Sequence, residues 1–307
     1  MLSNPFLFTL LRILPASLAS WLGGWLSTNI ARRNMKLRDQ RARTNLAILR
    51  PDLPEATREA MLTRRWFNLG RTMAELTNID RLIENNHISV EDAAGYQHVL
   101  DGPGPMIALA VHLGNWDLLA AHIKASTDRP GLGVYDPPQD AAQAAMLKRA
   151  RSSYMGEAIT GDGAARGILK HLTTKDRATL YILLDERRDR QVWFPRFGRD
   201  LPPSGNLSAA LRLGRKVGAK FLPFYMIRTS GPNFRVHWHP PLDPAQLTDD
   251  QIMDQVDAFL GKACIDHADQ WLALHDMDLA ALASSVRPEL VEGRARTSTG
   301  SAPTVVE

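Results

Sequence analysis

Short apolar runs alternate with amphipathic stretches from about residue 97 onward, and this alternation restricts the fold more than any other feature. Four of the runs have the length and composition of buried strands: MIALAV (106–111), GLGVY (131–135), ATLYILLD (178–185) and AKFLPFYMI (219–227). Stretches with a helical period separate them, namely LLAAHIKA, AAQAAMLKRARSSY, AARGILKHLTT and NLSAALRLGRKVG. Such alternation predicts an α/β fold with a mainly parallel central sheet flanked by helices on both faces.

The segments around this core carry patterns of their own. Residues 43–83 predict two amphipathic helices separated by Pro51–Pro54, with an apolar stripe that should be buried. The turn TSGPN (229–233) predicts an antiparallel hairpin between AKFLPFYMI and FRVHWHPPL. Residues 250–275 predict a closing helix. The tail from Ala283, which is rich in Ser, Thr, Gly, Pro and Arg, is expected to be disordered.

The N-terminal segment combines apolar and basic residues. Residues 5–26 are almost entirely apolar, and residues 1–50 contain eight Lys or Arg but a single acid, Asp39. Arg12 and Pro15 interrupt the apolar run, which argues against a helix that spans a membrane. We expect instead a segment that lies in one leaflet, with its basic flank on anionic lipid at the cytoplasmic side. The alternative is a helix packed on the body of the protein, with a solvated basic flank.

The organisation that follows has three parts. They are a membrane-associating N-terminal segment (1–43), an α/β domain (44–282) and a polar tail (283–307). A length of 307 residues with 44% hydrophobic and 23% charged residues is typical of a folded globular enzyme. Cys264 is the single cysteine, so an intramolecular disulfide and a thiolate cluster for structural zinc are excluded.

The stretch VHLGNWDLL (111–119) places polar residues directly after the strand MIALAV. His112 is expected at the carboxyl end of that strand, Gly114 and Asn115 in the turn, and Asp117 in the first turn of the next helix, with Asn115 as its cap. The carboxyl end of a strand is where α/β sheets bind ligands. A histidine there can take a proton from a hydroxyl group, provided that a carboxylate holds its other ring nitrogen. The spacing therefore predicts a pair in which His112 is the general base and Asp117 orients it.

Several blocks of the sequence, taken in order, resemble one family. They are RTNLAILRPDLP, RRWFNLGRTMAEL, HLGNWD, LLDERRDRQVWFPRFGR and GRKVGAKFLPFYMIR. Together they resemble the bacterial lipid A biosynthesis acyltransferases of the lauroyl or myristoyl type, which share an H-x4-D/E motif with the glycerolipid acyltransferases. The resemblance covers roughly residues 1–275 and implies a glycerolipid-acyltransferase-like fold for the domain.

The resemblance also implies an activity and its partners. Members of the family transfer a fatty acyl chain from acyl carrier protein, or from coenzyme A, to a hydroxyl of a lipid A precursor. They use no metal or organic cofactor and work at the cytoplasmic face of the inner membrane. The histidine of the motif acts as general base and its acid orients it, and these roles fall on His112 and Asp117.

A second group of candidate residues follows the strand ATLYILLD, in DERRDRQVWFPRFGR (185–199). Arginine side chains bind phosphate through two parallel hydrogen bonds and can stabilise an oxyanion. Arg187 and Arg188, and after them Arg190, are therefore expected to contact the substrate. Asp185 is expected to anchor this loop or to pair with an arginine. Gly114 and Asn115 complete the expected substrate-binding residues.

Alternatives to this interpretation stay open. The same chemistry could act on another membrane lipid, such as a glycolipid or an aminolipid, or the chain could be a non-catalytic lipid-binding protein with this fold. His237 and His239 share a strand face but have no third ligand nearby in the sequence, so a metal site is not expected there. Nucleic acid is not expected as a partner, because no recognised nucleic-acid-binding module accompanies the basic N-terminus.

Overall fold

The computed structural model describes residues 5–134, 141–151, 157–159, 164–188 and 191–280. Within them a seven-stranded sheet has the order β1-β9-β8-β2-β5-β3-β4. In that order the strands are Ile88–Val90, Asn233–Trp238, Lys220–Ser230, Met106–Ala110, Thr179–Leu183, Gly131–Val134 and Glu157–Ile159. All neighbouring strands are parallel except the hairpin partners β8 and β9. The predicted mainly parallel sheet and its antiparallel hairpin are thus confirmed.

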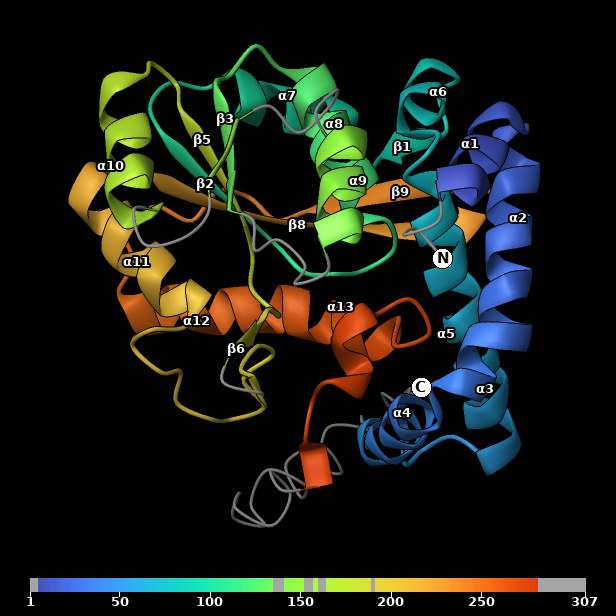
Figure 1. Cartoon of the computed structure of the whole chain (residues 1–307). Helices are drawn as coiled ribbons and strands as arrows, with labels where there is room; N and C mark the ends of the chain where they lie inside the picture. Colours follow the sequence, from blue (N-terminus) through green and yellow to red (C-terminus); the bar gives the residue numbers. More distant parts are fainter. Residues whose placement is uncertain (1–4, 135–140, 152–156, 160–163, 189–190, 281–307) are drawn as a thin grey trace, which may run out of the picture.

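The sheet is covered by helices on both faces, as the alternation of apolar runs predicts. Alternate residues of β2 belong to two separate cores: Ile107 and Leu109 to one, Met106 and Ala108 to the other. The first core is closed by α10 (Ala164–Thr174), α11 (Asn206–Val217), α12 (Asp249–Val256) and α13 (Lys262–Asp266), and the second by α6 (Ile79–Glu84), α7 (Ala93–Asp101) and α8 (Trp116–Ser126). In Figure 1, α12 and α13 run below the sheet and α7 and α8 lie above it, while α9 (Ala141–Arg151) is drawn beside α8.

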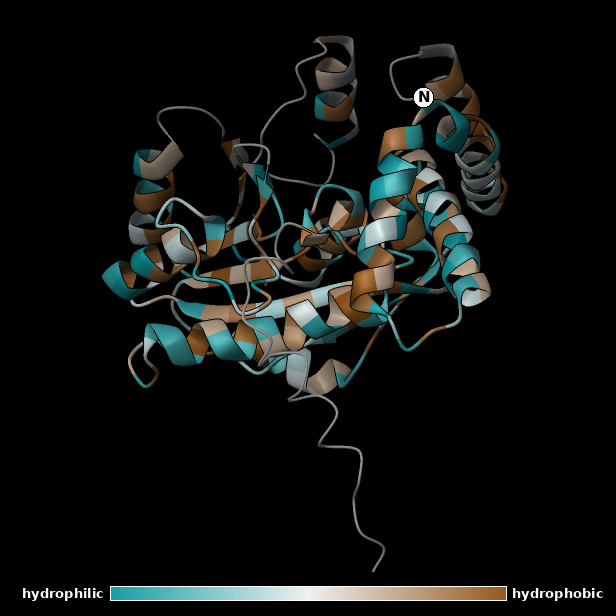
Figure 2. Cartoon of the chain, turned by 90° about the horizontal axis from the view of Figure 1, so that it is seen from below, coloured by the Kyte–Doolittle hydropathy of each residue, from teal (hydrophilic) through white to brown (hydrophobic). Residues whose placement is uncertain are grey.

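The N-terminal helices form a layer at one side of the sheet. They are α1 (Pro5–Ile13), α2 (Ala16–Leu26), the π-helical turn Ser27–Ala31, α3 (Arg32–Asn34), α4 (Lys36–Leu49) and α5 (Glu55–Glu75). The predicted pair of helices on either side of Pro51–Pro54 is confirmed by α4 and α5. The layer lies beyond the same end of the sheet in Figures 1 and 2. The helices that cover the sheet contain both hydrophobic and hydrophilic residues (Figure 2). Among the described residues, no helix has the length and apolarity that crossing a membrane requires.

Helices α2 and α5 pack at unusually short range because glycines lie where they cross. A Cβ atom at Gly23 would collide with Ala74 and with the carbonyl of Gly70, and a Cβ at Gly70 would collide with the backbone of Gly23. Only glycine permits this approach of two helix backbones. Helix α2 is therefore fitted closely to α5, which in turn contacts β8 and the turn after β2. Helix α4 runs across the boundary that the sequence predicts between residues 43 and 44.

The closing segment differs from the single helix that its sequence predicts. After α12 a π-helical turn (Asp257–Gly261) leads into α13, and a short 3₁₀ helix (Leu272–His275) follows. Side chains of the N-terminal layer bind backbone carbonyls of the segment that follows α13: Arg65 those of Trp271 and Leu272, and Asn45 those of Leu274 and Met277. These partners are distant in sequence, so no local pattern predicts them.

The sequence also misses the shortest elements. Strands β1 and β4 have three residues each, and the hairpin of β6 (Arg187–Arg188) and β7 (Gln191–Val192) has two on each side. Segments this short show no alternation, and helices α6 and α7 are likewise too short or too polar to be recognised. The predicted disordered tail, residues 283–307, lies outside the described residues.

Candidate active site

The turn after β2 requires glycine at position 114. Gly114 adopts φ +62°, and a Cβ atom there would collide with the carbonyl oxygen of Met226 on β8. Its N–H donates to the carbonyl of Gln270 at 3.2 Å. The side chain of Asn115 accepts a hydrogen bond from the N–H of Leu118 at 3.0 Å and so caps α8, as predicted. The hydrogen bonds to Gln270 and Leu118 hold the turn in place, and the turn positions His112.

Asp185 is the carboxylate that holds His112. Its Oδ1 lies 2.9 Å from Nδ1 of His112, and the backbone N–H of His112 donates to both of its oxygens at 3.0 and 3.1 Å. The indole N–H of Trp271 donates to Oδ2 at 2.8 Å. Asp185 is buried at the end of β5, which lies next to β2 in the sheet. Because a carboxylate only accepts, Nδ1 carries the proton and Nε2 is left as the basic nitrogen.

The structure differs here from the geometry that the sequence predicts. The hydrogen bond expected from Asp117 to the imidazole is made by Asp185 instead, and Asp117 receives a two-pronged contact from Arg151, with Nε at 2.7 Å and Nη2 at 3.0 Å. Asp117 is buried in the first turn of α8. The physical reason lies in the sheet: β5 runs beside β2, so Asp185 arrives opposite His112 although 73 residues separate them.

The surroundings of His112 favour its protonated form. Burial alone lowers the pKa of His112, but the negative charge of Asp185, its hydrogen bond and the charge of Asp117 outweigh burial and the nearby Arg151, so the pKa is raised above its ordinary value of 6.5. The side chain is still 23% exposed, and Nε2 has no hydrogen-bond partner among the described residues. The ring packs edge to face on Trp116, with centroids 5.1 Å apart. A partly exposed imidazole with one nitrogen free can exchange a proton with a bound substrate.

The structure describes fewer contacts for the arginines that follow Asp185 than for Asp185 itself. Arg187 is exposed and lies 3.6 Å from a carboxylate oxygen of Asp276. Arg188 lies in β6, where its backbone pairs with Gln191 of β7. Arg190 lies outside the described residues. Of the residues predicted after the strand, the structure brings Asp185 to His112.

Comparison with known proteins fixes the family. Residues 4–277 match the family model described as bacterial lipid A biosynthesis acyltransferase. The chain belongs to this family. It is therefore an acyltransferase, as the order of its sequence blocks indicates.

A solved structure is similar to this acyltransferase over most of its length. It is the crystal structure of the 1-acyl-sn-glycerophosphate (LPA) acyltransferase PlsC from Thermotoga maritima, which covers 77% of this chain and 99% of its own, with 13% sequence identity and a TM-score of 0.39. No curated protein matches the chain by sequence.

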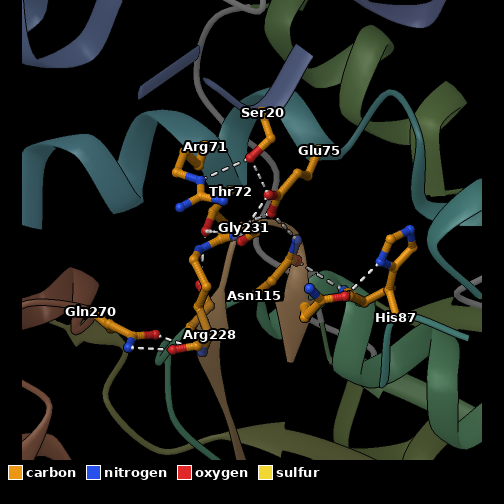
Figure 3. Close-up of polar contacts among 12 residues, drawn as sticks. Ser20, Arg71, Thr72, Glu75, His87, Asn115, Arg228, Gly231 and Gln270 are labelled. Carbon is orange, nitrogen blue, oxygen red and sulfur yellow. Dashed lines mark hydrogen bonds and ion pairs between the residues drawn. The ribbon is translucent and has the colours of Figure 1, made fainter. Parts of the chain in front are cut away.

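A buried ion pair of the acyltransferase supports the turn that carries His112 (Figure 3). Glu75 of α5 accepts two hydrogen bonds from Arg228 of β8, at 2.6 and 2.8 Å, and both side chains are buried. The same carboxylate accepts from Asn115 at 2.9 Å and from Ser20 of α2 at 2.6 Å. Burial alone raises the pKa of Glu75, but the charge and hydrogen bonds of Arg228 hold it below its ordinary value. Glu75 thus connects α2, α5 and β8 to the turn.

Two further contacts of the acyltransferase hold this turn in place. The hydroxyl of Thr72 donates to the carbonyl of Gly114 at 2.8 Å. Gln270 forms a pair of hydrogen bonds with the backbone of Arg228, accepting at 2.7 Å and donating at 3.0 Å (Figure 3). The sequence prediction did not include Glu75 or Arg228. One signal for Glu75 was present in the sequence. It is a charged residue at the border of the apolar stripe of α5, in GRTMAEL (70–76), and a charge in that position indicates a buried partner.

Proposed function

We propose that this acyltransferase moves a fatty acyl chain from an acyl thioester, on acyl carrier protein or coenzyme A, to a hydroxyl of a lipid A precursor, with His112 as the general base. The observation that carries the proposal is the contact of 2.9 Å between Nδ1 of His112 and the buried Asp185, which leaves Nε2 basic and free among the described residues. The family supports the acyl transfer. The identity of the donor and of the acceptor is part of the proposal.

In the proposed reaction Nε2 of His112 removes the proton of the acceptor hydroxyl while its oxygen attacks the thioester carbonyl carbon. The carbonyl π electrons move to the oxygen, and a tetrahedral oxyanion forms. When the carbonyl is restored, the carbon–sulfur bond breaks, and the leaving thiolate takes the proton back from the imidazolium. Asp185 stabilises the imidazolium through Nδ1. No other group needs to store the proton.

The remaining predicted site residues have proposed roles around this pair. Asp117, fixed by Arg151, adds a second negative charge that favours the imidazolium. Arg187, Arg188 and Arg190 are proposed to contact phosphate groups of the donor or acceptor, or the oxyanion.

We also propose that the acyltransferase acts at the cytoplasmic face of the inner membrane, bound to the bilayer surface through its N-terminal layer. Most of its exposed large apolar side chains in the described residues lie in this layer: Ile13, Leu18, Trp21, Trp25, Ile30, Met35, Leu37 and Ile48. Apolar side chains beside a basic segment are what interfacial binding to anionic lipid requires. A lipid acceptor would then reach the site without leaving the membrane.

An assay with purified protein tests the reaction. Acyl carrier protein and coenzyme A thioesters of graded chain length are offered with a lipid A precursor, a glycolipid or an aminolipid, and release of free thiol is measured. We expect acceptor-dependent release with the lipid A precursor, and a loss of about 10²–10⁴-fold in His112→Ala. His98→Ala, at an exposed histidine of α7, is the matched control and should keep full activity.

Each outcome of this assay decides one part of the proposal. Release with a glycolipid or an aminolipid alone would keep the chemistry and replace the acceptor. Absence of release with every donor and acceptor would favour a lipid-binding protein without catalysis. Full activity in His112→Ala would reject His112 as the base.

A further inference from the structure

A cationic pocket lies in the N-terminal layer, away from the residues assigned to acyl transfer. It encloses about 430 Å³ and involves the π-helical turn, α3 and the start of α4. The residues that line it are Thr28, Arg32, Arg33, Lys36, Asp39, Gln40 and Arg43. Four of them are cationic and one is acidic.

The acid of the pocket is already fully engaged, so positive charge is left over. Asp39 accepts from Arg32 at 2.8 Å, from Arg43 at 3.1 Å and from the indole of Trp66 at 2.7 Å. Glu59 of α5 contacts the same two arginines from outside the pocket. Arg33 and Lys36 are exposed and have no acidic partner among the described residues. These two cations are available to an anion, and the paired arginines are held in place beside them.

Thr28 supplies an independent indication of a ligand. Its hydroxyl oxygen is buried and has no hydrogen-bond partner among the described residues. A buried hydroxyl without a partner is unfavourable, and such a group in a folded protein calls for an explanation. Thr28 also belongs to a π-helical turn, a local distortion that is frequent at functional sites. A rotation of the Thr28 side chain toward the pocket would let an anionic oxygen accept the hydrogen bond of this hydroxyl.

Apolar side chains on the elements around the pocket indicate what kind of molecule carries the anion. Trp25, Ile30, Met35 and Leu37 are exposed apolar side chains on the elements that form or adjoin the pocket, and Leu37 is 78% exposed. A soluble phosphate compound would gain nothing from these side chains. A phospholipid would, because its phosphate lies at the depth where apolar side chains enter the bilayer and basic ones remain at its surface.

We infer that this pocket, in which Asp39 is paired with Arg32 and Arg43, binds the phosphate of an anionic membrane phospholipid. The inference rests on the proposed binding to a bilayer surface and is independent of the acyl transfer chemistry. A bound phosphate would accept hydrogen bonds from Thr28 and from the two unpaired cations. It would fix the depth and the orientation of the N-terminal layer at the membrane.

Vesicle binding by the full chain tests the pocket. Sedimentation with phosphatidylcholine vesicles is compared with that for vesicles that also contain phosphatidylglycerol, using the wild type, Arg33→Gln with Lys36→Gln, and Thr28→Val. The control is Arg38→Gln with Arg41→Gln, which removes the same charge from exposed positions of α4 that do not line the pocket. The melting temperature of each variant is measured to establish that it is folded.

We expect the pocket double variant to lose about tenfold more affinity for phosphatidylglycerol vesicles than the control, because direct contacts add charge-assisted hydrogen bonds to the long-range attraction. Thr28→Val should weaken binding severalfold without a change of charge. Equal losses in the two double variants, with wild-type binding by Thr28→Val, would overturn the pocket and leave membrane association intact. Failure of the wild type to bind either vesicle would overturn both. Release from vesicles by low concentrations of soluble glycerol 3-phosphate would assign the pocket to a soluble ligand and overturn the lipid assignment.

Discussion

His112 keeps one ring nitrogen for Asp185 and leaves the other unpaired among the described residues. The Asp185 carboxylate is itself held by the backbone of His112 and by the indole of Trp271. A buried, hydrogen-bonded carboxylate holds the imidazole ring in one orientation. The raised pKa of His112 has a direct consequence for the rate. If His112 is the base, as we propose, it acts only when neutral, so activity should rise with pH through a value above 6.5.

Gly114→Ala tests the steric requirement of the turn. We expect a large loss of activity and of stability, because alanine at φ +62° is strained by about 1–3 kcal/mol and its Cβ also meets the carbonyl of Met226. Gly104→Ala is the control, since Gly104 has φ +78° but open space around it. The free energy of unfolding should fall by about 2 kcal/mol more in Gly114→Ala than in the control. Equal effects would show that the contact with β8 does not restrict the turn.

At the scale of elements, a buried ion pair joins α5 to β8 and, through Asn115, to the cap of α8. Removing one member of such a pair leaves a buried charge, which costs about 3–5 kcal/mol, whereas removing both costs less. The carboxylate of Glu75 also accepts a hydrogen bond from Ser20 of α2, so α2 and the turn that carries His112 share one partner.

A double-mutant cycle measures this connection. Glu75→Leu and Arg228→Met should each lower the free energy of unfolding strongly, and the double variant should be about 2 kcal/mol more stable than the sum of the single losses predicts. Because the pKa of Glu75 is depressed, its contribution is present above pH 4.5, its ordinary pKa, and is lost as the pH falls through the folded value. Additive losses in chemical denaturation would mean that the pair is not coupled.

At the scale of the whole molecule, the N-terminal layer is part of the folded structure. Leu11 and Ala19 are fully buried, and α2 crosses α5 at glycines. The layer also carries most of the exposed large apolar side chains of the described residues. The layer is thus fitted to the rest of the protein, and its exposed apolar side chains are those that we propose to meet the membrane.

Deletion of residues 1–26 tests whether the layer is integral to the fold. We expect the free energy of unfolding to fall by at least about 3 kcal/mol, because several apolar side chains lose their burial and Glu75 loses the hydroxyl of Ser20. Differential scanning calorimetry of the shortened and full chains gives the comparison. An unchanged melting temperature would mean that α1 and α2 are an appendage.

The long elements could be predicted from the sequence because their signals are local. Runs such as MIALAV and AKFLPFYMI are dense in apolar residues, and helix caps and prolines mark the ends of neighbouring helices, so the parallel sheet and its hairpin are foreseen. His112, Gly114 and Asn115 are also placed correctly, since a strand, a turn and a cap follow one another within four residues. Strands of two or three residues carry too little pattern to be recognised.

The partner of His112 could not be predicted, because it depends on which strands are neighbours. Asp117 is the nearest acid in the sequence, but sheet order places β5 beside β2 and brings Asp185 to the imidazole. The same reason hides Glu75 and Arg228, whose contact joins residues 153 positions apart. A residue pattern fixes which side chains are present at a strand end, whereas the topology fixes which of them meet.

The most direct test compares Asp185→Asn with Asp117→Asn in the dependence of kcat on pH. An asparagine at position 185 removes the charge that raises the pKa of His112, so the acidic limb of the profile should move to lower pH. The rate on the plateau should fall by about 10²–10⁴-fold, because the imidazolium loses its partner. Asp117→Asn should move the limb less and leave most of the plateau rate. A profile in which Asp117→Asn shows the large shift and loss, while Asp185→Asn behaves as the wild type, would contradict the assignment of Asp185 as the partner of His112.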